Sequence, residues 1–130
     1  MRSDTWFRRA LMATGVMNFA GFVAFLPPFP YLRRFAGFPE AENPFYGWLI
    51  ALWILFFGIA YLRLAVARTL DRTTVGLGAA GKASFFLVLI ACGLQGQLPV
   101  TTALGGVPDL LFAILFILWL FRGREESYGR

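Results

Sequence analysis

Four apolar stretches leave this chain of 130 residues with little room for any other kind of structure. A bilayer core about 30 Å thick is crossed by roughly 20 helical residues, so four crossings with short connections use nearly all of the chain. The sequence therefore predicts an all-α integral membrane protein, a single membrane domain over residues 1–130 with four transmembrane helices in a bundle. The predicted helices lie near residues 8–26, 44–66, 75–98 and 102–121.

The composition supports a membrane location and argues against several other classes of protein. Hydrophobic residues make up 58% of the chain and charged residues 15%, whereas soluble domains carry about 25% charged residues. The net charge is +5, but the basic residues stand at the ends of apolar segments and not on one solvated face, so we expect no nucleic-acid partner. With no histidine and one cysteine, the usual zinc, haem and copper ligand sets are not available from this chain alone. We expect no cofactor, and because no nucleophile–base pair is visible, we do not expect an enzyme.

The basic residues are divided unevenly between the two sides of such a bundle. The connection 27–43 carries Arg33 and Arg34, and all the other basic residues fall on the opposite side. Because cytoplasmic loops are enriched in Lys and Arg, this bias predicts that both termini are cytoplasmic and that the loop 27–43 is extracytoplasmic. The basic residues of the predicted cytoplasmic side are Arg2, Arg8, Arg9, Arg63, Arg68, Arg72, Lys82, Arg122, Arg124 and Arg130.

The third apolar stretch, residues 75–98, contains one charge, Lys82. Two roles for Lys82 are open: a lysine near the membrane surface whose stem snorkels to the headgroups, which we favour, or an intramembrane charge with a function. The glycines at 76–81 match the dinucleotide pattern GxGxxG, but no strand precedes them, so they indicate close helix packing instead. The residues that share a face with Lys82, which we expect to look into the bundle, are Gly78, Phe85, Leu89, Cys92 and Gly96.

Three further polar residues are candidates for packing or function within the membrane. Asn18, on the first predicted helix, is expected mainly to hydrogen-bond a neighbouring helix. Gln95, at the far end of the third, is expected to contact headgroups, a neighbouring helix or a small ligand. Asp109 is either a solvated residue in a first helical turn or a buried carboxylate with a function. Because Lys82 and Asp109 lie near the starts of helices that run in opposite directions, we expect them toward opposite surfaces and not paired.

The connection 27–43 is rich in proline and aromatic residues. Its rings fit a belt at headgroup depth, where an aromatic side chain can be both apolar and hydrated. Long loops also carry function, so the same residues are candidates for docking a partner or a lipid. The candidate docking residues are Phe29, Tyr31, Phe35, Phe38 and, at the start of the next helix, Trp48.

These features predict an accessory or structural subunit of a larger membrane complex, acting through helix packing and lipid contacts. The alternative is a small oligomeric transporter or channel that uses Asn18, Lys82, Gln95 and Asp109 as pathway residues. The expected partners are membrane lipids and other membrane subunits or further copies of the chain. In the layout of its four apolar stretches the chain resembles the small bacterial membrane proteins grouped as DoxX-like. That resemblance implies the bacterial cytoplasmic membrane and an association with a respiratory or redox complex.

Overall fold

The computed structural model describes residues 4–128, and the side-chain environments of residues 4–123. Over that range the protein is helical, without strands. Three segments are long and apolar enough to cross a membrane, as expected for an integral membrane protein: Pro44–Val66, Arg72–Leu94 and Val100–Gly123. Arg2 and Arg130 of the predicted cytoplasmic set lie outside the described residues, as does the side chain of Arg124. The helices are α1 (Thr5–Phe25), α2 (Pro30–Phe35), α3 (Pro44–Val66), α4 (Arg72–Leu94), α5 (Val100–Leu104) and α6 (Val107–Tyr128).

Local capping signals decide where α3 and α4 begin. Asn43 precedes α3, and its side chain accepts a hydrogen bond from the backbone N–H of Phe45 at 3.0 Å, while Pro44 occupies the first turn. Asp71 caps α4 in the same way by accepting a hydrogen bond from the N–H of Thr74 at 2.8 Å. The sequence predicted a start of this helix near residue 75, whereas α4 begins at Arg72.

The last apolar stretch is divided into two helices. The prediction of a single helix near residues 102–121 is wrong: α5 ends at Leu104, and α6 begins at Val107. The break falls at Gly105–Gly106, because glycine weakens a helix interior. Pro108 lies in the first turn of the new helix, where its missing N–H removes no helical hydrogen bond.

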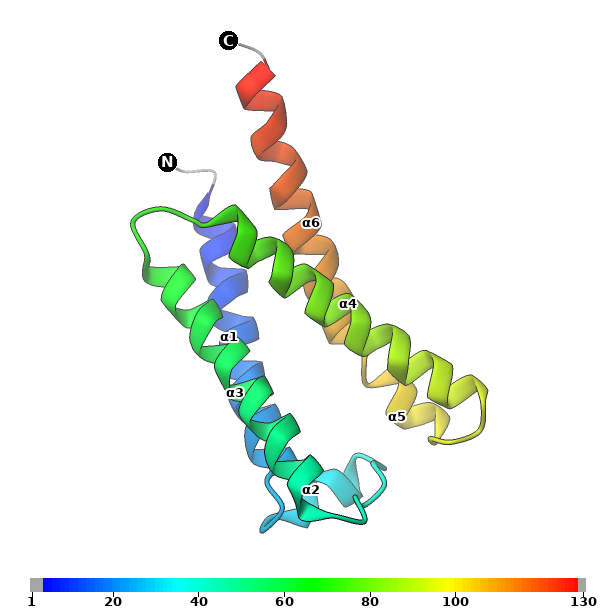
Figure 1. The fold of residues 1–130 in the computed structure, drawn as a ribbon. Coiled ribbons are helices and arrows are strands. Elements are labelled where there is room, and N and C mark those ends of the chain that lie inside the picture. The colour runs from blue at the N-terminus through cyan, green and yellow to red at the C-terminus, as the bar shows by residue number, and fades with distance from the viewer. Residues whose placement is uncertain (1–3, 129–130) are drawn as a thin grey trace.

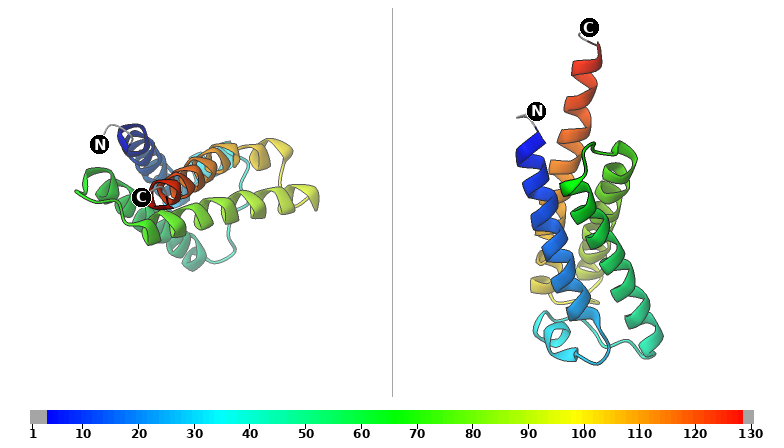
Figure 2. Two further views of the ribbon diagram at one scale, coloured as in Figure 1. Left: turned by 90° about the horizontal axis from the view of Figure 1, so that it is seen from above. Right: turned by 90° about the vertical axis from the view of Figure 1, so that its left-hand side faces the viewer.

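The long helices form two antiparallel pairs, α1 with α3 and α4 with α6. Figure 1 shows the pairs lying together at the end of the molecule that holds both termini and diverging toward the other end, where α2 and α5 lie. In the right-hand view of Figure 2 the four long helices run roughly along the vertical, and α6 extends beyond the other helices. The left-hand view, from above, shows the helices fanning out, with α4 drawn nearly along its length. The molecule therefore has a narrow end and a wide end.

An aromatic core holds the narrow end together. Phe7 of α1 and Phe116 of α6 are fully buried and meet edge to face, with ring centroids 5.5 Å apart. Trp119 stacks on Phe7 at 4.7 Å, and Tyr61 of α3 meets Phe116 at 5.5 Å. Aromatic pairs in these geometries attract one another beyond the area that they bury. The core thus joins the two helix pairs through three of the four long helices.

Candidate functional site

A buried ion pair joins α4 to α6. The ammonium Nζ of Lys82 lies 2.9 Å from the carboxylate Oδ1 of Asp109, with side chains 4% and 16% exposed. Nζ also lies 3.4 Å from Oδ1 of Asn18 on α1, a longer contact. The amide Nδ2 of Asn18 in turn donates to the backbone carbonyl of Ile54 on α3 at 3.0 Å. One polar cluster therefore links all four long helices, and we call Asn18, Lys82 and Asp109 the polar triad.

Both the preference for a snorkelling Lys82 and the expectation that Lys82 and Asp109 do not pair are wrong. Lys82 lies ten residues after Arg72, about 15 Å along α4, so it stands near the middle of that helix. Asp109 lies in the first turn of α6, which begins only after α5 and the break at Gly105–Gly106. The start of α6 therefore lies beside the middle of α4, and the two charges meet. The earlier start of α4 at Arg72 adds almost one turn to the depth of Lys82.

Aromatic rings surround the ammonium group of Lys82. Nζ lies 5.3 Å from the ring centroid of Tyr61 and 5.5 Å from that of Phe112, within the range of cation–π attraction. Close approach of Tyr61 depends on Gly78: a Cβ there would lie 2.7 Å from Cε1 of Tyr61 and 3.0 Å from the ring of Phe116. The expectation that glycine allows close packing beside Lys82 is confirmed at Gly78.

A cavity of about 1110 Å³ lies between the two helix pairs. The four long helices and both short ones contribute to its wall, which is mainly apolar. The three members of the polar triad are part of this wall. Other wall residues include Ala20, Gly21, Leu32, Phe35, Leu49, Trp53, Phe57, Tyr61, Gly81, Phe85 and Leu89.

The polar triad lies at the end of the cavity nearer the narrow end of the molecule. On α1 and α4, Asn18 and Lys82 are among the first residues along the helix that line the cavity. On α3, which runs antiparallel to α1, Tyr61 is the last residue that lines it. The rest of the wall on these helices extends from there toward the wide end. The cavity thus has an apolar body with one polar end, which is the arrangement that receives an amphiphilic molecule.

A contact between α5 and the segment after α2 bridges the two helix pairs at the wide end. The hydroxyl of Thr102, a buried residue, donates to the backbone carbonyl of Ala36 at 2.6 Å. Gly37 follows with φ +79°, a conformation that glycine adopts without strain, and it leaves room for the Thr102 side chain. This contact, the latch, connects the two helix pairs at the end opposite the aromatic core. Sequence reasoning missed it because a threonine in a short segment carries no long-range signal.

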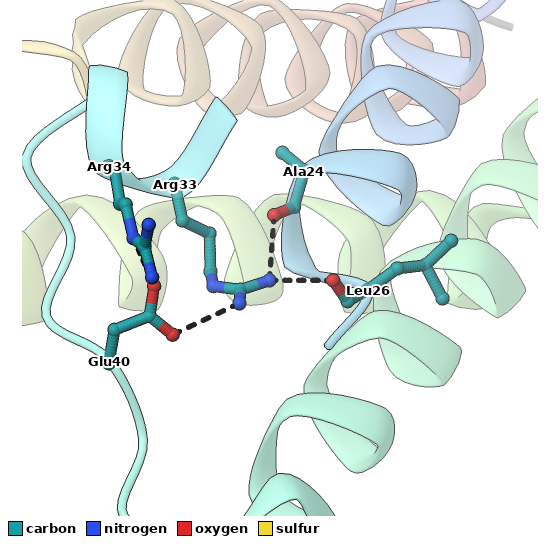
Figure 3. A network of polar contacts seen from close by, with 5 residues as sticks. All are labelled: Ala24, Leu26, Arg33, Arg34 and Glu40. Atoms are coloured by element: carbon teal, nitrogen blue, oxygen red, sulfur yellow. Dashed lines mark hydrogen bonds and ion pairs between the residues drawn. The ribbon is translucent and has the colours of Figure 1, made fainter. Parts of the chain in front are cut away.

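The loop 27–43 is tied to the end of α1 by Arg33, as Figure 3 shows. Its guanidinium Nη1 donates to the carbonyls of Ala24 at 3.2 Å and Leu26 at 2.7 Å, and Nη2 pairs with Glu40 at 3.2 Å. Arg34 contacts the other carboxylate oxygen of Glu40 at 3.1 Å. The hydrogen bond from Arg33 above all, and then that from Arg34, holds the pKa of the Glu40 carboxyl below its usual value.

The remaining predicted residues are spread over the wide end and do not join the polar triad. Gln95 is exposed, follows the last residue of α4 and does not belong to the cavity wall. Phe29, Tyr31 and Trp48 are exposed. Phe35 is 94% exposed yet reaches the cavity wall, and Phe38 is half-buried against Phe25, with centroids 5.1 Å apart.

Among the side chains of residues 4–123, no group of three or more from His, Cys, Asp or Glu is placed to hold a metal ion. The polar triad instead offers one cation, one anion and one amide in an apolar setting, which is a set of hydrogen-bonding groups with no net charge. Comparison with family models, curated proteins and solved structures gives no match. The likeness to DoxX-like proteins therefore stays a prediction from the layout of the sequence.

Proposed function

We propose that this protein binds an amphiphilic molecule of the membrane between its two helix pairs. The observation that carries the proposal is the cavity of about 1110 Å³, which is apolar along its length and ends at the polar triad. Ligand cavities commonly measure about 300–1,000 Å³ and combine an apolar lining with a few polar groups that orient the ligand. A lipid chain would occupy the apolar body, and its headgroup would meet Asn18, Lys82 and Asp109.

The proposed topology has four crossings, with α1 as the fourth, and places both termini in the cytoplasm of a bacterium. In Figure 1 the start of α1, the end of α3, the start of α4 and the end of α6 lie at the same end of the molecule. In the sequence, these helix ends and the connection between α3 and α4 contain Arg8, Arg9, Arg63, Arg68 and Arg72. The wide end, with α2 and the latch, would then face the outside. Release of the bound molecule on that side would make the protein a small carrier, as in the transporter alternative.

The test compares two glycine-to-leucine substitutions on α4. A Cβ on Gly81 would lie 3.5 Å from the ring of Phe57, an ordinary contact, and a leucine there extends into the cavity. Gly76 lies on the same helix outside the cavity wall, and a Cβ there meets nothing within 4 Å. Both substitutions raise helix propensity, so they differ mainly in the space that they occupy.

The three proteins would be purified from native membranes in mild detergent, and the lipids extracted from each would be identified by mass spectrometry. We expect an amphiphile in stoichiometric amount with the unaltered protein and with Gly76→Leu, and a several-fold loss with Gly81→Leu. The absence of any enriched amphiphile, or equal amounts in the two variants, would overturn the proposal.

A second candidate function is the accessory subunit, and the outer face of α3 favours it. Phe45, Tyr46 and Trp48 are exposed in the first turns of this helix, and Phe56 is exposed farther along it. Aromatic residues are enriched where membrane subunits meet each other and where they meet the interface. Intact-mass measurement of the assembly from native membranes tests this: we expect larger subunits in fixed ratio, and a free single chain would contradict it.

A further inference from the structure

The charges around the cavity determine what kind of headgroup it accepts, and this inference rests on the proposed function. The polar triad contains one positive and one negative group, paired at 2.9 Å, so its net charge is zero. An additional charge brought into this apolar space would have no counter-ion of its own. Burial of an unpaired charge is costly in such surroundings, whereas a hydrogen-bonded neutral group is tolerated.

The two charged groups retain hydrogen-bonding capacity for a ligand. An ammonium group has three N–H donors, and the contacts of Lys82 to Asp109 and Asn18 engage two of them. A carboxylate has about four acceptor positions, and the ion pair uses Oδ1 of Asp109. Asp109 is 16% exposed and belongs to the cavity wall. A hydroxyl group can accept from Lys82 and donate to Asp109 at the same time.

We propose that the cavity selects a long-chain lipid whose headgroup is uncharged and carries a hydroxyl, such as a long-chain alcohol or an acylglycerol. The ion pair between Lys82 and Asp109 supplies both a donor and an acceptor for that hydroxyl. A fatty acid anion would compete with Asp109 for Lys82, and an alkylammonium ion would compete with Lys82 for Asp109. Each would leave one charge of the pair without its partner.

The experiment measures retention of three probes with the same chain, hexadecanol, hexadecanoate and hexadecylammonium, by the protein in phosphatidylcholine nanodiscs. Hexadecane serves as the probe without a headgroup. We expect hexadecanol to be retained about tenfold more than either charged probe and more than hexadecane. Equal retention of all four would overturn the headgroup selection and leave the proposed function intact. Retention of none of them would overturn both.

Variants of the ion pair test the origin of the selection. Asp109→Asn leaves Lys82 unpaired and should reverse the preference toward hexadecanoate, whereas Lys82→Met should reverse it toward hexadecylammonium. The double variant Lys82→Met with Asp109→Leu removes both charges, and it replaces the single variants in the retention test if one of them does not fold. This double variant should still retain both hexadecanol and hexadecane but should no longer prefer hexadecanol. An unchanged preference in the folded variants would contradict the proposal.

Discussion

The narrow and wide ends of the molecule are built from the same four long helices but are held together in different ways. At the narrow end, Phe7, Phe116 and Trp119 fill the space between the helix pairs with rings in direct contact. At the wide end the pairs line an open cavity, and the latch between Thr102 and Ala36 connects them. The difference shows that one bundle can concentrate its packing in one half and leave the other half available for a ligand.

The polar triad lies at the boundary between the two ends. In lipid there is no water-driven collapse between helices, so packing and interhelical hydrogen bonds hold a bundle together. The triad contributes the hydrogen bonds where the aromatic packing stops. Arg8 reinforces the narrow side by donating to the carbonyls of Ala65 at 2.9 Å and Ala67 at 2.6 Å, at the end of α3.

The largest loss of stability should come from removing a buried ring at the narrow end. Phe116→Ala removes a ring that is fully buried against Phe7 and Tyr61, and we expect a loss of about 3 kcal/mol in the free energy of unfolding. Unfolding in detergent, followed by circular dichroism, measures it. Leu118→Ala on the same helix, at a position 57% exposed, is the control and should change little. Equal losses in the two variants would remove the distinction between a packed and an open end.

Breaking the ion pair should give the next largest loss of stability, and the losses from the two single variants should not add up in the double variant. Lys82→Met or Asp109→Asn leaves one buried group without its partner and should cost about 3 kcal/mol in the free energy of unfolding. The double variant Lys82→Met with Asp109→Asn should cost clearly less than the sum of the two single variants, because neither charge remains. The same unfolding measurement completes the cycle. Strict additivity would show that the pair is not coupled.

Breaking the latch should have a smaller effect that is confined to the wide end. Thr102→Val keeps the shape of the side chain but removes the donor to Ala36, at a cost of about 1 kcal/mol. Hydrogen–deuterium exchange should accelerate in α2 and α5 while the amides around Phe7 stay protected. Thr101→Val, an exposed neighbour on α5, is the control. Faster exchange throughout the molecule would mean that the latch supports the whole bundle.

The smallest effect is expected at the loop, and it depends on pH. The pKa of Glu40 is lowered in the folded protein, so its interaction with Arg33 stabilises the loop at neutral pH and is lost as the pH falls through the folded pKa. Glu40→Gln should therefore speed hydrogen exchange in residues 30–40 at pH 7. As the pH falls through the lowered folded pKa, below the usual range of a glutamate carboxyl, the two proteins should become more alike, because the carboxyl of the unaltered protein becomes protonated. Glu42→Gln, at an exposed position, is the control and should leave hydrogen exchange in residues 30–40 unchanged at pH 7.

The sequence by itself determined the helical class, the apolar segments and the start of one helix, at Pro44. These properties depend on local information: the length of an apolar run and the proline at position 44. The sequence also singled out Asn18, Lys82 and Asp109 as unusual for an apolar setting, since polar groups in lipid are costly wherever they lie. Gln95 was singled out for the same reason but lies at an exposed helix end.

Only the tertiary structure decided which of these residues meet. Whether Lys82 reaches Asp109 depends on where two antiparallel helices begin and on the break at Gly105–Gly106, and an error of one turn shifts a residue by about 5 Å in depth. The cavity depends on the angle between the two helix pairs, which is set by side chains as distant in sequence as Phe7 and Phe116. The pattern of apolar residues indicates how far each helix is buried in lipid, but it does not indicate which neighbour each helix packs against.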